Sequence, residues 1–188
     1  MALDKSYCRE LLEKQPELKG ILKIKTSDLT DNYRRLYNMR KTIQAPLLAF
    51  CLRELLQMST EGVSVSMRLA LFEQISREDI MLQEEIDEFS ALGDLIEVYR
   101  GTVYEERDPG LSWSLKRRVA ESFFKGKLLK ATIAKDSILA YIGGDYEYEV
   151  IARVPYDAVE VLEEDNRYFD DWCVEVQKEA FELGDRFG

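Results

Sequence analysis

Histidine is absent from this sequence of 188 residues. Its absence excludes serine and cysteine triads that use imidazole as the base, histidine metal sites and histidine acid catalysis. Any acid–base chemistry must therefore be carried by carboxylates. Cysteine is scarce as well: Cys8, Cys51 and Cys173 are widely spaced and odd in number, which is typical of reduced cytosolic thiols.

Long apolar runs are also missing. No run approaches the roughly 18 apolar residues of a membrane span, and the start of the chain lacks a basic stretch followed by an apolar one. We therefore expect a cytoplasmic protein that does not contact a membrane. Basic residues are outnumbered, 26 against 36 acidic ones, which gives a net charge of −10. This charge argues against a general affinity for nucleic acid and leaves only a local basic patch open.

The chain does contain enough apolar sequence for a core, because 46% of its residues are hydrophobic. Residues 1–92 have the apolar spacing of helices and are expected to form a helical N-terminal region packed on the rest of the chain. The type of the segment 63–72 stays open, since it alternates like a strand but is followed by helix formers. The predicted helices cover residues 3–15, a segment capped by Asp28 or Thr30 that extends to Arg40, the apolar run after Pro46, and residues 76–91.

After Gly93 the apolar period changes to two, which is typical of strands. Residues 93–188 are expected to form a strand-rich core, and the whole chain is expected to be of the α+β class. A short helix is predicted from Ser114, and a final helix over 168–183. The predicted strands cover residues 95–104, 128–134, 137–142, 147–154 and 156–162.

Arg100 is the first of three unusual polar features in this second part. Alternate residues of a strand share one face, so Arg100 lies on the same face as Ile96 and Val98, where an apolar residue is expected. A charge in that position needs an anionic partner.

The other two features follow Arg100 along the chain. Trp113 stands between Ser112 and Ser114 at the predicted helix start. Glu147 and Glu149 project from one side of a predicted strand, with their carboxylates roughly 7 Å apart.

Each feature also has an ordinary structural explanation when it is taken alone. A strand-end arginine most often pairs with a structural carboxylate, serines ahead of a helix cap it, and a Glu-Tyr-Glu strand is usually the solvated face of an amphipathic strand. The order of the three features along the chain favours a functional interpretation over these explanations.

That order resembles the arginine-serine-glutamate branch of the mono-ADP-ribosyltransferases. This branch has an arginine at a strand end, then a serine tripeptide entering a helix, then Glu-x-Glu starting a later strand after a glycine turn. The sister branch has a histidine in place of the arginine, and this chain has none. The motifs here are Tyr99-Arg100-Gly101, Gly110-Leu111-Ser112-Trp113-Ser114 and Glu147-Tyr148-Glu149.

The sequence departs from the family pattern at two points. Trp113 occupies the middle of the serine motif, where the family usually has threonine. Only eleven residues separate Arg100 from Ser112, fewer than in the large secreted toxins, so the resemblance is to a compact, toxin-like type. Trp113 can be interpreted either as a residue that lines the nicotinamide site or as a core side chain.

The resemblance implies that residues 93–188 are a catalytic core, an ADP-ribosyltransferase-like split β-sheet that uses NAD as its substrate. Breaking the nicotinamide–ribose bond leaves a positively charged sugar, and Glu149 would stabilise that charge. Arg100, with its neighbour Gly101, would bind the pyrophosphate through parallel hydrogen bonds. Ser112 would hold Glu149 or the ribose, and the rest of the serine motif, Trp113 and Ser114, would complete the NAD site.

The resemblance also implies how an acceptor would be recognised. Glu147 would orient and deprotonate an acceptor guanidinium, and Gly144, Asp145 and Tyr146 would form the acceptor loop. The function expected is that of a mono-ADP-ribosyltransferase whose partners are NAD and a protein acceptor, with arginine favoured. An NAD glycohydrolase, a non-catalytic binding protein that retains the fold, and a helical partner-binding protein stay open as alternatives.

Overall fold

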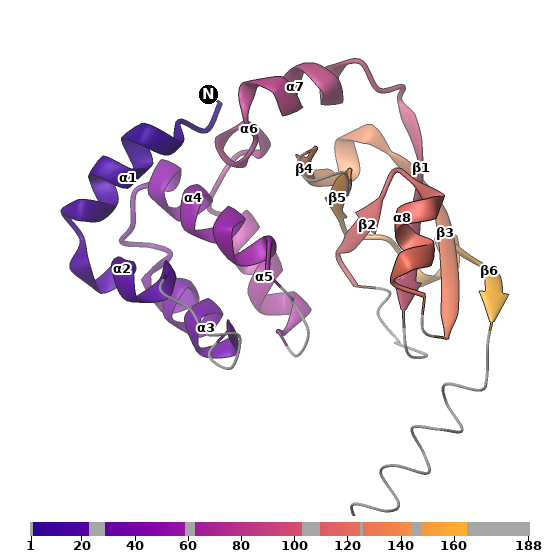
Figure 1. Ribbon diagram of the computed structural model, residues 1–188, viewed down its shortest axis with the longest axis horizontal. Coiled ribbons are helices and arrows are strands. Elements are labelled where there is room, and N and C mark those ends of the chain that lie inside the picture. Colours follow the sequence, from indigo (N-terminus) through magenta and orange to yellow (C-terminus); the bar gives the residue numbers. More distant parts are fainter. Residues whose placement is uncertain are drawn as a thin grey trace, which may run out of the picture. The chain divides into compact units, whose positions relative to one another are not determined.

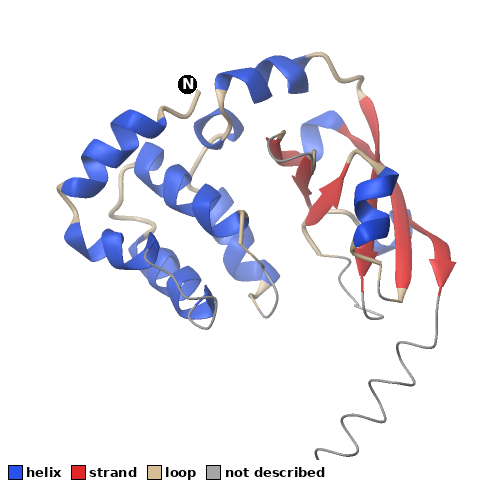
Figure 2. Ribbon diagram, in the orientation of Figure 1, coloured by secondary structure: helices blue, strands red, loops and turns tan. Residues whose placement is uncertain are grey.

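A computed structural model describes residues 2–22, 29–58, 63–102, 110–124, 126–143 and 148–164. The chain divides into two compact units, which we call the helical unit and the sheet unit. The helical unit comprises residues 1–92 and 139–142, and the sheet unit comprises residues 93–138 and 143–188. Among the described residues, the helical unit is built mainly of helices, and most of the strands lie in the sheet unit (Figures 1 and 2).

The described residues ahead of the first strand are helical, as the apolar spacing predicts. The segment 63–72, whose type the sequence left open, contains a helix. The helices are α1 (Lys5–Glu13), α2 (Pro16–Leu22), α3 (Leu29–Met39), α4 (Ala45–Leu56), α5 (Val65–Phe72), α6 (Arg77–Ile80) and α7 (Gln83–Ser90).

Helix α4 forms the centre of the helical unit. Nine of its 12 residues are buried, as expected for a helix that is apolar on most sides. It packs against α1, α2, α3 and α6, so its apolar side chains fill the space between these helices. Pro46 stands in its first turn, where the missing N–H has no helical partner to lose.

The single helix predicted over residues 76–91 is wrong, because the chain breaks between α6 and α7. Met81 is extended, with a ψ of 142°, and its carbonyl accepts a hydrogen bond from the Leu3 N–H at 2.8 Å. The Leu82 N–H is accepted by the Glu85 side chain at 2.8 Å, so a new helix begins there. The predicted capping box of Ser76 and Asp79 is present, but it begins only the short α6.

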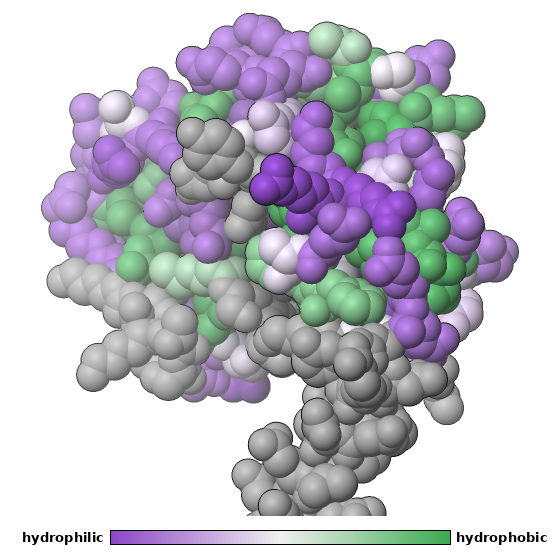
Figure 3. Space-filling model, turned by 45° about the vertical axis from the view of Figure 1, so that its right-hand side comes forward, coloured by the Kyte–Doolittle hydropathy of each residue, from purple (hydrophilic) through white to green (hydrophobic). Residues whose placement is uncertain are grey.

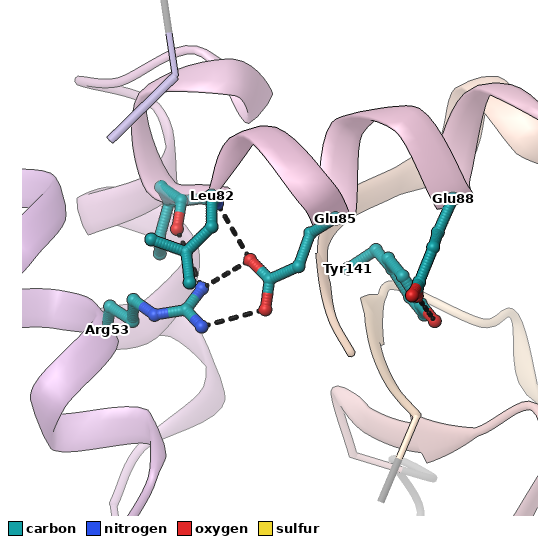
Figure 4. Close-up of polar contacts among 6 residues, drawn as sticks. Arg53, Leu82, Glu85, Glu88 and Tyr141 are labelled. Atoms are coloured by element: carbon teal, nitrogen blue, oxygen red, sulfur yellow. Dashed lines mark hydrogen bonds and ion pairs between the residues drawn. The ribbon is translucent and has the colours of Figure 1, made fainter. Parts of the chain in front are cut away.

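Glu85 also belongs to a buried ion pair that joins α7 to α4. Its two oxygens accept from both terminal nitrogens of Arg53 at 2.8 Å, and Arg53 Nη1 also donates to the Ile80 carbonyl at 3.0 Å. The side chains of Arg53 and Glu85 are only 2% and 5% exposed. Figure 4 shows this network together with the nearby bond from the Tyr141 hydroxyl to Glu88 Oε2, which is 2.8 Å long.

The described strands form one antiparallel sheet in the order β4-β5-β2-β1-β3-β6. The chain is therefore a mixed helical and sheet protein, as the change of period predicts. Short 3₁₀ turns, η2 (Lys135–Ser137) and η4 (Tyr156–Ala158), precede two of the strands. The strands are β1 (Leu95–Thr102), β2 (Ser112–Ser114), β3 (Lys127–Ala134), β4 (Ile138–Ile142), β5 (Glu149–Ala152) and β6 (Val159–Glu164).

Helix α8 (Arg117–Ser122) lies against β1 and β2 (Figure 1). Its close approach depends on Gly101, because a Cβ atom added to Gly101 would lie 2.3 Å from the Ala120 carbonyl oxygen. Glycine is therefore required at this point of β1 for the backbone of α8 to pack on the sheet.

Several predictions about the second part are corrected by the structure. The segment 112–114, predicted to enter a helix directly, is itself a strand, because it pairs with β1 and β5 on its two sides. The apolar alternation predicted over 147–154 is wrong for β5, since Val150, Ile151 and Ala152 are all fully buried. The predicted strand over 156–162 instead starts with η4 and becomes β6 at Val159. The helix predicted over 168–183 lies outside the described residues.

Hydrophilic and hydrophobic residues are interspersed on the face drawn in Figure 3. In the described part of the chain, none of the helices has the length and apolar character that crossing a membrane would require. The large apolar side chains that the structure leaves exposed are Tyr7, Leu95, Phe123, Tyr156 and Val161.

Candidate functional site

The order of the strands brings Arg100, Ser112 and Glu149 onto three adjacent strands, β1, β2 and β5. The pairing register aligns them further. Tyr99 of β1 faces Ser114 of β2, and Ser114 in turn faces Glu149 of β5. Three residues that are far apart in the sequence therefore lie at one place in the sheet.

Ser112 and Glu149 are in direct contact through their side chains. Ser112 faces Ile151, two residues beyond Glu149, so the serine and the glutamate are diagonal neighbours on one face of the sheet. The Ser112 hydroxyl donates a hydrogen bond to Glu149 Oε1. Both residues are partly exposed, so the carboxylate is held in place and still open to solvent on part of its surface.

Arg100 reaches the same serine through the main chain. Its neighbour Tyr99 shares a face with Ser114, so Arg100 starts from the opposite face, with Ile96 and Val98. Its Nη1 donates to the Ser112 carbonyl oxygen at 2.7 Å. The guanidinium therefore reaches the edge of β2.

The hydrogen-bond ladder explains why this carbonyl is available. The Ala152 N–H donates to the Leu111 carbonyl at 2.9 Å and the Leu115 N–H donates to the Tyr148 carbonyl at 3.1 Å. Because antiparallel partners alternate between bonded and non-bonded pairs, the main chain of Ser112 is directed toward β1 instead of β5. The described pairing of β1 with β2 consists of Tyr99 and Ser114. Arg100 thus donates to the Ser112 carbonyl the hydrogen bond that a main-chain N–H of a neighbouring strand would otherwise donate.

The backbone at the start of β5 has an unusual conformation that sequence reasoning missed. Tyr148 has a φ of 47°, the left-handed region, which is sparsely populated by residues other than glycine. Two contacts from the link between β2 and α8 hold it: the Leu115 N–H bonds its carbonyl, and Lys116 Nζ lies 4.9 Å from the centroid of its ring. Nothing in an aromatic residue type signals such a conformation, and it directly precedes Glu149.

Three further predicted site residues have clear packing contacts. Trp113 is 2% exposed, and its indole Nε1 donates to the Gly110 carbonyl at 3.3 Å. The Ser114 hydroxyl is buried and accepts from the Lys116 N–H at 3.0 Å, next to the start of α8. Gly101 lies under the backbone of α8.

The predicted acceptor-side residues Gly144, Asp145, Tyr146 and Glu147 lie outside the described residues. The structure therefore describes one carboxylate of the predicted pair, Glu149, and the contacts that hold it. Within the described ranges, no group of three or more Cys, Asp or Glu residues is arranged to hold a metal ion.

Comparison of the chain with protein-family models, with curated proteins and with solved structures found no significant match. The fold defines a mixed helical and antiparallel-sheet protein, and the site defines a serine that bonds a carboxylate through its hydroxyl and an arginine through its carbonyl. The chemical argument rests on these residues. A fixed carboxylate can stabilise a developing positive charge, and a guanidinium bonded to the same serine can bind a phosphate group.

Proposed function

We propose that this chain is a cytosolic mono-ADP-ribosyltransferase with an ADP-ribosyltransferase-like core, which cleaves the nicotinamide–ribose bond of NAD and transfers ADP-ribose to an acceptor, with protein arginine favoured. One observation carries the proposal: Ser112 contacts both Arg100 and Glu149. This supports the proposal because the arginine and the glutamate of the family's motif order both contact the serine, although Glu149 follows Ser112 by 37 residues.

Glu149 is the proposed catalytic residue. The bond between the nicotinamide nitrogen and ribose C1′ breaks, and nicotinamide leaves as a neutral molecule with the bonding electron pair. The ribose carries positive charge in the transition state, as in glycosidases, and a fixed carboxylate stabilises that charge without reorganisation. The hydrogen bond from Ser112 supports this role because it restricts the carboxylate.

Arg100 is proposed to bind the pyrophosphate. A guanidinium presents five N–H donors in a planar fork, so it can bond a phosphate while one nitrogen holds the Ser112 carbonyl. The positive charge of Arg100 then lies near the anionic part of NAD, and Glu149 lies near the ribose.

Transfer requires an acceptor with an available electron pair. An acceptor nitrogen forms the new bond to ribose C1′, and the acceptor's proton passes to a base, for which we propose Glu147. A carboxylate is suited to this task because the guanidinium of an arginine acceptor has a very high pKa and must lose a proton as the bond forms.

The Glu149→Gln variant tests the proposal most directly. It keeps the side-chain shape but removes the charge, so nicotinamide release from NAD should fall by about 100-fold or more, while the NAD dissociation constant changes little. Glu160→Gln on the exposed edge strand β6 is the matched control and should keep wild-type turnover. Residual turnover above about a tenth of wild type in Glu149→Gln would contradict the assignment.

The same assay separates transfer from hydrolysis when agmatine is added as an arginine analogue. Transfer predicts an agmatine adduct in the wild-type reaction. Glu147→Gln should then lose the adduct while nicotinamide release continues. If the wild type releases nicotinamide but modifies neither agmatine nor any protein, the activity is that of an NAD glycohydrolase.

A further inference from the structure

We propose that Gly110 and Trp113 form a support that fixes the guanidinium of Arg100, with Trp113 acting through Gly110. The expected effect of this support on NAD binding rests on the proposed function. The contacts themselves do not, since they are made within the protein.

Gly110 provides the space for the guanidinium. A Cβ atom added at this position would lie 2.8 Å from Arg100 Nη2, 2.9 Å from Cζ and 3.2 Å from Nη1. Gly110 also has a φ of 76°, a conformation that other residues rarely adopt. Glycine is therefore needed here for the backbone conformation, and a Cβ atom at this position would force the guanidinium of Arg100 to shift.

Trp113 fixes the position of Gly110. Its main chain lies in β2, where it faces Val150 of β5, and its side chain is 2% exposed. The indole N–H donates to the Gly110 carbonyl at 3.3 Å. An indole held by burial on every side can thus anchor the residue that precedes β2.

Ser112 completes the arrangement because its carbonyl accepts from Arg100 Nη1 at 2.7 Å. A planar guanidinium that is bonded at one nitrogen and in contact with Gly110 has little freedom to rotate. The segment 110–114 therefore positions the arginine as a unit. Trp113, at the position where the family usually has threonine, is then a positioning residue rather than part of the nicotinamide site.

The first experiment measures NAD binding by calorimetry and turnover by nicotinamide release. Gly110→Ala should raise the dissociation constant about tenfold, and Trp113→Phe, which keeps the ring but loses the N–H, about three- to tenfold, with smaller changes in kcat. In an Arg100→Lys background both substitutions should have little further effect on binding, because the planar group that they position is gone. Gly93→Ala is the control, since its added Cβ would meet only the Leu95 carbonyl, at 3.9 Å.

The second experiment needs no NAD. Gly110→Ala should lower the melting temperature by several degrees, and by clearly less in an Arg100→Ala background, because part of the cost is the clash with the guanidinium. Equal losses in both backgrounds would overturn the support. If the wild type binds no NAD, the proposed function fails. The comparison of melting temperatures in the two Arg100 backgrounds then decides by itself whether Gly110 and Trp113 support the guanidinium. If Gly110→Ala does not fold, Trp113→Phe replaces it, and an equal loss in both Arg100 backgrounds again overturns the proposal.

Discussion

Ser112 contacts both charged residues of the candidate site through different atoms. Its carbonyl accepts from Arg100, and its hydroxyl donates to Glu149. A substitution can therefore remove one contact and leave the other, because any residue at this position keeps the carbonyl. Substitutions of the Ser112 side chain test how the Glu149 carboxylate is held without disturbing the bond to the Arg100 guanidinium.

Ser112→Ala should lower kcat for nicotinamide release roughly 10- to 100-fold, since a hydrogen bond to a charged group contributes about 1.5–3 kcal/mol. The NAD dissociation constant should change little, because the carbonyl still holds Arg100. Ser137→Ala is a suitable control, since it removes an exposed hydroxyl that bonds the Ala134 carbonyl. A rise in the dissociation constant without a loss of kcat would show that Ser112 serves binding instead of the carboxylate.

The register around these residues could not be derived from the sequence. Arg100, Ser112 and Glu149 are recognisable separately as polar residues in strands, and the family order predicts that they act together. Which atom of Ser112 meets which partner depends on the pairing of β1, β2 and β5, and a shift by one residue would turn every side chain to the other face. The left-handed conformation of Tyr148 is likewise set by contacts from a distant segment.

At the scale of elements, the apolar period predicts the position of a helix or strand correctly where the element buries one continuous face. Helices α1, α3 and α4 and strands β1, β3 and β4 lie within or close to the predicted ranges. The predictions fail where non-local contacts decide. The break between α6 and α7 depends on Glu85, which bonds both Leu82 and Arg53. Strand β2 exists because partners on both sides pair with it.

The buried ion pair of Arg53 and Glu85 joins α4 to α7, and breaking it should be costly. Arg53→Met leaves the Glu85 carboxylate buried without its partner, so the free energy of unfolding should fall by about 3–5 kcal/mol in urea titrations. Arg34→Met, which removes an exposed arginine paired with Asp31, should change it little.

A double variant tests the physical reason for that loss. If the cost comes from an uncompensated buried charge, Arg53→Met combined with Glu85→Leu should be less destabilised than Arg53→Met alone. A double variant that is less stable by the sum of both single losses would instead indicate that each side chain contributes independently, for example through the bond from Glu85 to the Leu82 N–H.

At the scale of the whole molecule, the two described cysteines make the opening of the helical unit measurable through the reactivity of their thiols. Burial, and then the nearby charge of Asp4, raises the pKa of the Cys8 thiol from 9.0 to about 11. Burial, and then Cys8 and Glu54, raises the pKa of Cys51 to about 12. Both thiols are fully buried and unpaired in disulfides, so they stay protonated at neutral pH.

We therefore expect iodoacetamide at pH 8 to label these two thiols only when the helical unit opens, which mass spectrometry of the peptides would measure. A raised pKa means that the folded chain binds the proton more tightly, so stability is unaffected well below pH 9.0 and falls as pH rises toward 11 and 12. A variant with Cys8→Ala and Cys51→Ala should lose stability less steeply from pH 8 to 10. Native labelling at the rate of a free thiol would contradict the burial.

Most of strand β4 belongs to the helical unit, yet it follows most of the described sheet unit in the sequence. Residues 139–142 belong to the helical unit, where Tyr141 bonds Glu88 and its ring lies 6.4 Å from that of Phe89. A chain emerging from a ribosome usually completes its N-terminal unit first. Here residues 139–142 are synthesised after residues 93–138 of the sheet unit, so the helical unit gains its contacts with Tyr141 only once part of the sheet unit has been made.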